Sequence, residues 1–150
     1  DWSSDVCSSD LYTFNIGKAV ILRDPSDITF IATGSMVYES IEAARLLEAE
    51  GVSAGVINVH TIKPLDTDII DMALEASKII VTVEEHSIIG GLAGAVAEYK
   101  SAKKNSPPQL SLGLADKYDI SGDYRFLLDY HDLVGSKIAQ KANIFLDQCG

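Results

Sequence analysis

The chain has 150 residues, of which 47% are hydrophobic and 23% charged, and it carries a formal net charge of -10. This size and composition predict one globular domain, and the acidity argues against a nucleic-acid binder because phosphates would be repelled. No apolar run reaches the roughly 18 residues of a membrane span. Cys7 and Cys149 lie near opposite ends without metal-ligand spacing. We therefore expect neither a disulfide framework nor a zinc site, and a cytoplasmic location.

Residues 1–11, DWSSDVCSSDL, differ from the rest of the chain because they repeat Ser-Ser-Asp and show no hydrophobic period. They lack the basic and apolar segments of a signal peptide. They resemble translated adaptor sequence of the kind that often heads genes from shotgun metagenome reads, and a natural polar tail is the alternative. In both cases we expect a disordered tail. If the segment is a sequence artefact, the natural protein begins upstream, and the domain at residues 12–150 belongs to a truncated piece.

Strands and helices are expected to alternate along this domain. Short apolar runs bounded by turn-forming residues predict five strands, at residues 18–22, 28–32, 54–59, 79–83 and 110–114. A helix of mostly small residues follows Gly90-Gly91. Other periodic segments predict helices at residues 36–50, 66–76, 121–130 and 135–147.

Several helix ends carry recognisable capping residues. Ser35 is placed to cap the first helix, and Gly51 follows that helix where a left-handed residue is favoured. Asp66 is the expected N-cap of the second helix, with Leu65 and Ile70 spaced for a hydrophobic staple.

Helices that alternate with buried strands indicate parallel βαβ units and a sheet covered on both faces, which is a three-layer α/β/α fold. The turn between the first two strands is too short for a parallel crossover. We therefore predict a five-stranded mixed sheet with four parallel strands and the first strand antiparallel.

The segment KIIVTVEEHSIIGGLAGAVAEY, at residues 78–99, is the most informative part of the chain. A buried strand is followed by Glu84, Glu85 and His86, at the edge of the sheet where α/β proteins place their chemistry. Adjacent carboxylates point to opposite sides of an extended chain, so at most one faces a given cleft. A neighbouring carboxylate could hold His86, and His60 could approach it from another strand.

No nucleophile motif and no second histidine at metal-ligand spacing accompany His86. We therefore interpret the segment as a polar loop that hydrogen-bonds a neighbouring domain, with a chemical role for His86 as the alternative. No catalytic, cofactor-binding or metal residue is assigned from the sequence.

Two strand–helix junctions could attract an anion through free backbone N–H groups and the helix dipole, the turn Thr33-Gly34-Ser35 and the pair Gly90-Gly91. Neither is part of a G-x-G-x-x-G or Walker pattern. A tight turn explains the first. Close helix–strand packing explains the second, and the small residues Ala93, Ala95 and Ala97 support it.

Four segments in order carry a family resemblance: IATGS (31–35), INVHTIKPLD (57–66), VEEHSIIGGLAGAVAE (83–98) and YDISGDYRFLLDYHDL (118–133). They resemble the C-terminal domain of the transketolase family, which includes deoxyxylulose-phosphate synthase and the beta subunits of 2-oxo acid dehydrogenases. The similarity spans residues 12–146. Within the family, the chain most resembles the separately encoded C-terminal subunit of split bacterial transketolases.

The resemblance implies a thiamine diphosphate- and Mg²⁺-dependent enzyme that moves a two-carbon ketol unit between sugar phosphates. In that family the cofactor lies between a diphosphate-binding domain, with a G-D-G motif, and a pyrimidine-binding domain that supplies an activating glutamate. Ser121-Gly122-Asp123-Tyr124 is not a G-D-G motif. The resemblance therefore implies a fragment that does not bind the cofactor or turn over alone.

The role that the resemblance implies is assembly, through contacts with the pyrimidine-binding domain and the diphosphate-binding subunit in a dimer or other homo- or hetero-oligomer. It also suggests the strand order 1-3-2-4-5. The loops from Thr33 to Ser35 and from Glu84 to Gly91 would then flank a topological switch point. The alternative is an independent flavodoxin-like domain that binds a small anion at these two loops.

Overall fold

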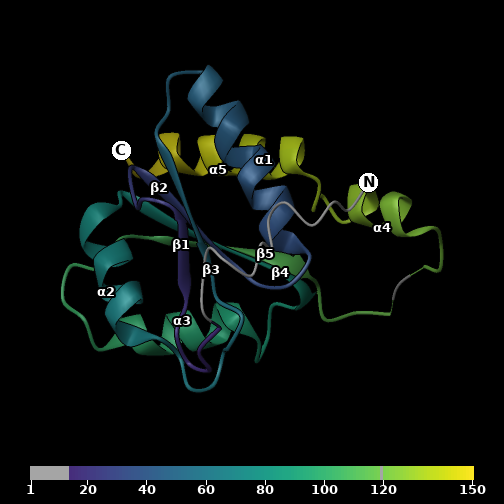
Figure 1. Cartoon of the computed structure of the whole chain (residues 1–150). Helices are drawn as coiled ribbons and strands as arrows, with labels where there is room; N and C mark the ends of the chain where they lie inside the picture. The colour runs from purple at the N-terminus through teal and green to yellow at the C-terminus, as the bar shows by residue number, and fades with distance from the viewer. Residues whose placement is uncertain (1–13, 119) are drawn as a thin grey trace.

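A five-stranded mixed sheet forms the centre of the molecule (Figure 1) in a computed structural model that describes residues 14–118 and 120–150. The elements in chain order are β1 (Val20–Arg23), β2 (Ile28–Ala32), α1 (Met36–Ala49), β3 (Ala54–Asn58), α2 (Thr67–Ala76), β4 (Ile79–Ser87), α3 (Leu92–Ser101), β5 (Gln109–Leu114), α4 (Tyr124–Tyr130) and α5 (Gly135–Cys149). The predicted disordered tail and Cys7 lie outside the described residues.

The strand order is β1-β3-β2-β4-β5. The β1–β3 pair is antiparallel and the other three pairs are parallel, so the predicted mixed sheet is confirmed. Ala32, at the end of β2, pairs with Asn58 on one side and with Val83 on the other. The carboxyl ends of these strands therefore meet at one edge, and the switch point lies between β2 and β4.

Two separate cores flank the sheet, as the alternation of side chains along a strand requires. Phe30 of β2 is buried against α1 and α5, whereas its neighbour Ile31 belongs to the core beneath α2 and α3. Figure 1 shows α1 and α5 on one face of the sheet and α2 and α3 on the other. The expected three-layer arrangement is confirmed.

Strand β4 is longer than the sequence analysis predicted. It continues through Glu84, Glu85 and His86 to Ser87, so these residues form part of a strand and not a loop. The pairing with β5 shifts register between Val83 and Ser87, where the ladder resumes opposite Leu114. The polar residues are therefore held by backbone pairing at both ends of an irregular stretch.

Several element ends also differ from the prediction. Helix α4 begins at Tyr124 and not at residue 121, because the Asp123 side chain accepts a hydrogen bond from the Arg125 backbone N–H at 3.0 Å and caps the helix there. Strand β1 covers Val20–Arg23 and not residues 18–22. Gly51 has the predicted left-handed conformation, with φ of 84°.

The cap predicted at Asp66 is only partly correct. Asp66 is the residue before α2, but its side chain makes no capping bond. Its carboxylate accepts a hydrogen bond from the Ala19 backbone N–H at 2.9 Å instead. The side chain thus ties the chain segment before β1 to the start of α2.

None of the helices in the described ranges is long and apolar enough to cross a membrane. Cys149, the one cysteine within those ranges, is an exposed free thiol.

Candidate functional site

The carboxyl edge of the sheet holds the residues that the sequence singled out, and Glu84 is the most deeply buried of them. Its side chain turns inward from β4, and the residue is 1% exposed. The two carboxylate oxygens accept hydrogen bonds from the backbone N–H groups of Leu92 and Ala93, each at 2.8 Å. A carboxylate at a helix N-terminus satisfies free donors and complements the helix dipole. Glu84 therefore caps α3 across the turn that joins it to β4.

Gly91 makes this cap possible. A Cβ atom at Gly91 would overlap the Glu84 carboxylate and would lie 3.1 Å from the Ser87 carbonyl oxygen. The close helix–strand packing predicted at Gly90-Gly91 is confirmed at Gly91, with Glu84 as the main contact. It is wrong for Gly90, where a Cβ would meet no atom within 4 Å and the φ of 80° is what favours glycine. The predicted support from small residues is correct for buried Ala93 and wrong for Ala97, which is exposed.

Glu85 points to the opposite side, as its position on a strand requires. Its exposed carboxylate accepts hydrogen bonds from the hydroxyl groups of Ser35 and Tyr124. Burial raises the pKa of the Tyr124 phenol, and the neighbouring Glu85 carboxylate acts in the same direction. Ser35 is the residue before α1, but its side chain makes no capping bond, so the predicted cap is only partly correct. Its hydroxyl instead links the β2–α1 turn to β4. Glu85 thus joins three segments that are distant in sequence.

Glu39 makes a second connection from α1 to the C-terminal part of the chain. Although charged, it is 5% exposed. One carboxylate oxygen accepts a hydrogen bond from Arg125 Nη1, and the other accepts one from the Gly135 backbone N–H, both at 2.7 Å. Buried carboxylates are stabilised by such complete pairing. Glu39 therefore fixes α4 and the start of α5 against α1.

The two candidate histidines occupy different places along this edge. His86 is exposed, and its Nδ1 lies 3.3 Å from the Ser87 carbonyl oxygen. His60 follows β3, where its Nδ1 lies 2.9 Å from the Thr61 hydroxyl. Its ring packs against that of Phe14, with 4.4 Å between the two ring centroids. Because β2 separates β3 from β4, His60 and His86 end non-neighbouring strands. Within the part of the chain that the structure describes, the two histidines make no contact with each other.

The turn at Thr33-Gly34-Ser35 matches its structural interpretation. The Met36 N–H donates to the Thr33 carbonyl at 3.3 Å, and Gly34 has φ of 59°, which favours glycine. The Thr33 N–H donates to the Val83 carbonyl and so has a partner. With three carboxylates nearby on α1 and β4, this edge is electrostatically unfavourable for a small anion.

Most of these polar groups already serve as structural partners. Glu84 caps a helix, Glu85 joins two hydroxyls, and Glu39 pairs with an arginine. Within residues 14–118 and 120–150, no group of three or more His, Cys, Asp or Glu side chains could hold a metal ion. The arrangement fixes the shape of the edge and leaves His86 at its surface, which suits contact with another protein surface better than acid–base chemistry.

Three residues of this edge were missed by the sequence analysis: Glu39, Tyr124 and Arg125. Glu39 was open to detection, because it lies at helical spacing from Met36 and Ala43 and places an acidic residue on the buried face of α1. Tyr124 and Arg125 belong to the segment at residues 118–133 that carries the family resemblance, but their contacts left no local signal, since their partners lie 39 and 86 positions away in sequence.

In a comparison with known protein families, residues 17–138 match the family described as "Transketolase, C-terminal domain". A Methanocaldococcus jannaschii protein, named provisionally as a transketolase C-terminal section, is 43% identical over 129 residues, or 86% of this chain and 40% of its own length. The 1-deoxy-D-xylulose-5-phosphate synthase of Dictyoglomus thermophilum is 39% identical over 126 residues, or 84% of this chain and 20% of its own length.

A solved structure described as a split-gene transketolase in an inactive β4 tetramer superposes with a TM-score of 0.80 and 35% identity. The match covers 92% of this chain and 45% of that one. The chain thus spans less than half the length of each of these relatives.

Proposed function

The chain belongs to the transketolase C-terminal domain family, and on this basis we propose that it is the assembly domain of a thiamine diphosphate-dependent transketolase in the cytoplasm. The enzyme would transfer a two-carbon ketol unit between sugar phosphates, with the cofactor supplying the carbanion chemistry. The observation that carries the proposal is the match to a split-gene transketolase chain, over 92% of this chain but 45% of that one.

The residues described here do not fit the cofactor itself. A diphosphate–metal group needs oxygen ligands for the metal and donors for the phosphates. The carboxylates of Glu39, Glu84 and Glu85 are engaged by protein donors and would repel a diphosphate. We therefore assign cofactor binding to the pyrimidine-binding domain and the diphosphate-binding subunit, and we derive no catalytic step within this chain.

The surface proposed for docking these partners is the carboxyl edge together with α4. His86 and Glu85 are exposed there, and Glu85 is bonded to Tyr124 at the start of α4. Helix α4 and the segment before it also expose several large apolar side chains, namely Tyr118, Ile120, Tyr124, Phe126 and Tyr130. Aromatic residues of this kind are enriched at protein interfaces.

A chimaera would test this function. The part of the split-gene transketolase chain that matches this domain would be replaced by residues 12–150, and the product would be mixed with its partner subunit, thiamine diphosphate and Mg²⁺. We expect complex formation by light scattering, and ketol transfer from xylulose 5-phosphate to ribose 5-phosphate. The isolated chain is the control, and we expect no turnover from it.

Two outcomes would contradict the proposal. One is turnover by the isolated chain with the cofactor. The other is a folded chimaera that neither assembles nor turns over. The sequence upstream of residue 12 in an intact gene adds an independent check, since a pyrimidine-binding region should end just before Tyr12, whereas a start codon there would favour an independent domain.

A further inference from the structure

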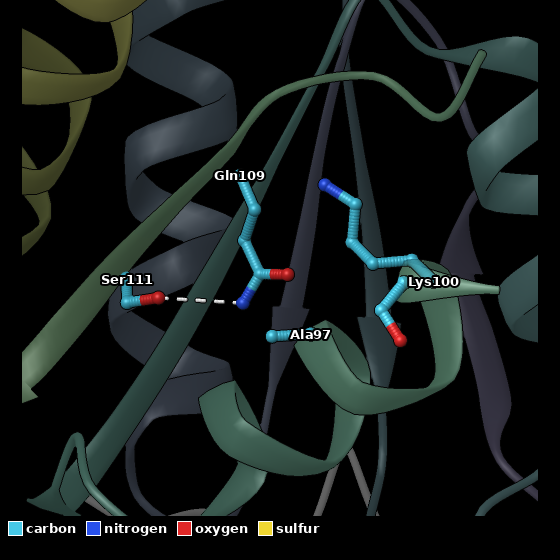
Figure 2. A pocket seen from close by; sticks show the side chains of 5 residues that line it. Ala97, Lys100, Gln109 and Ser111 are labelled. Atoms are coloured by element: carbon cyan, nitrogen blue, oxygen red, sulfur yellow. Dashed lines mark hydrogen bonds between the residues drawn. The ribbon is translucent and has the colours of Figure 1, made fainter. Parts of the chain in front are cut away.

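A shallow, open cavity with both polar and apolar lining lies far from the carboxyl edge, between α3 and β5. It has a volume of about 340 Å³ and is lined by Ala97, Lys100, Ser101, Gln109 and Ser111. Figure 2 shows the Gln109 carboxamide and the Lys100 side chain on opposite sides of this cavity. None of these residues contributes to the contacts described above, so the cavity is a separate feature of the fold.

Lys100 has an unbalanced positive charge. Its ammonium group donates to the Pro107 carbonyl oxygen, and no carboxylate is paired with it in the part of the chain that the structure describes. Partial burial lowers the pKa of this amine. Lys103, one turn later, differs because the Asp71 carboxylate lies 2.9 Å from its Nζ. A half-buried cation with one neutral acceptor is a favourable partner for an anion.

The other lining groups add hydrogen-bonding capacity. Gln109 Nε2 donates to the Ala93 carbonyl at 3.0 Å and to Ser111 Oγ at 3.3 Å, which fixes the orientation of the amide. The Ser111 oxygen thus acts as an acceptor, and its O–H remains a donor. Gln109 Oε1 is buried without a hydrogen-bond partner. An acceptor of this kind is costly to leave unpaired and favours an incoming O–H donor.

We infer that the α3–β5 cavity binds a small anion that carries hydroxyl groups. The anionic group would contact Lys100 and the Ser111 hydroxyl. A hydroxyl of the ligand would donate to Gln109 Oε1, once a local movement of the lining side chains exposes this buried atom. This site combines one cation, one hydroxyl donor and one unpaired acceptor. A purely apolar ligand would leave all three groups without a partner, and a neutral polyol would leave the charge of Lys100 unpaired.

The test is a titration of the isotope-labelled full chain, followed by the backbone amide NMR signals of residues 97–111. The probes are glycerol 3-phosphate, glycerate, inorganic phosphate and glycerol. We expect glycerol 3-phosphate and glycerate to shift these signals. Comparing these two probes shows whether the site prefers a phosphate or a carboxylate group. Inorganic phosphate should bind more weakly, and glycerol should not bind. Probe concentrations up to about 10 mM would detect binding with a Kd of about 1 mM.

Matched variants identify the responsible charge. Lys100→Met should weaken binding about tenfold, the effect of losing one charge-assisted hydrogen bond. Lys104→Met removes the same charge from an exposed neighbour outside the cavity and should change binding less than about twofold. Ser111→Ala should also weaken binding and serves as a second, less disruptive variant. The inference is overturned if no probe shifts these signals, or if Lys100→Met and Lys104→Met reduce binding equally.

Discussion

The carboxylate of Glu84 occupies the space that a side chain at Gly91 would need. Glu84 lies within β4 and Gly91 directly precedes α3, and together they hold the N-terminus of α3 against the strand. The Glu-Glu-His and Gly-Gly parts of this segment are therefore one structural unit, in which the first glutamate caps the helix that the second glycine begins.

Replacement of Gly91 by alanine should destabilise the chain. The added methyl group would displace the Glu84 carboxylate, and such overpacking costs about 1–3 kcal/mol. Gly94→Ala is the matched control on the same helix, since a Cβ there meets no atom within 4 Å. This second change should stabilise α3 by about 0.5–1 kcal/mol. Urea unfolding measures the change in free energy of unfolding for both variants. Equal changes would contradict an overlap between the added methyl group at residue 91 and the Glu84 carboxylate.

Removal of the Glu84 carboxylate should expose the start of α3. In Glu84→Ala the Leu92 and Ala93 N–H groups lose their acceptor, which costs about 1–3 kcal/mol. Hydrogen exchange at these two amides should accelerate more than at the middle of the helix. Glu85→Ala removes an exposed carboxylate from the same strand and should leave both amides protected. Unchanged exchange in Glu84→Ala would show that the cap does not stabilise the helix.

The contact between Glu39 and Arg125 should hold α4 in place. Arg125→Met keeps an unbranched, flexible side chain but removes the guanidinium group that donates to buried Glu39. We expect faster limited proteolysis of α4 and of residues 120–123 before it, because this bond anchors the start of the helix. Arg45→Met removes an arginine paired with Glu42 on the surface of α1 and should not change cleavage. Identical cleavage of the two variants would rule out this anchoring role.

The predicted topology was correct because it depends on strong local signals. Apolar runs of β-branched residues mark buried strands, and the short turn before Ile28 excludes a parallel connection between β1 and β2. The strand order, by contrast, came from the family resemblance and not from periodicity. Helix lengths were predicted within a few residues, where Gly51 supplied a clear stop.

The site was predicted less well because its contacts connect distant segments. Glu84 looked like a loop residue, since charged residues rarely continue a buried strand. Its role depends on α3, eight residues later, and on the absence of a side chain at Gly91. Ser35 had the sequence of a capping residue, but Glu85 competes successfully for its hydroxyl. Tertiary hydrogen bonds of this kind leave no local pattern.

The ion pairs around Asp132 give a pH-dependent prediction. The hydrogen bond from Lys141, and then that from Lys137, hold the pKa of Asp132 below its usual value. A lowered folded-state pKa stabilises the folded chain above the unfolded pKa, and this contribution disappears as the pH falls below about 4. Asp132 has φ of 59°, a conformation that asparagine also tolerates.

Asp132→Asn should therefore isolate the charge. At pH 7 we expect a loss of less than about 1 kcal/mol, because both pairs are partly exposed to solvent. The difference from the unmodified chain should shrink toward zero under acidic conditions, where Asp132 is protonated. Urea unfolding of both chains at pH 7 and below about pH 4 measures this difference in stability. A difference that is the same at both pH values would exclude the ion pairs as its source.

The turnover of assembled enzyme that carries His86→Ala tests the docking role of the carboxyl edge most directly. The measurement uses the chimaera, with complex formation followed by light scattering. Once assembly is complete, the substitution should change kcat less than about threefold. Loss of a general acid or base, by comparison, typically lowers the rate by a factor of about 10²–10⁴. Any effect should instead raise the partner concentration needed for assembly. A fall in kcat of about 100-fold with the complex intact would contradict the docking role and make His86 a catalytic residue.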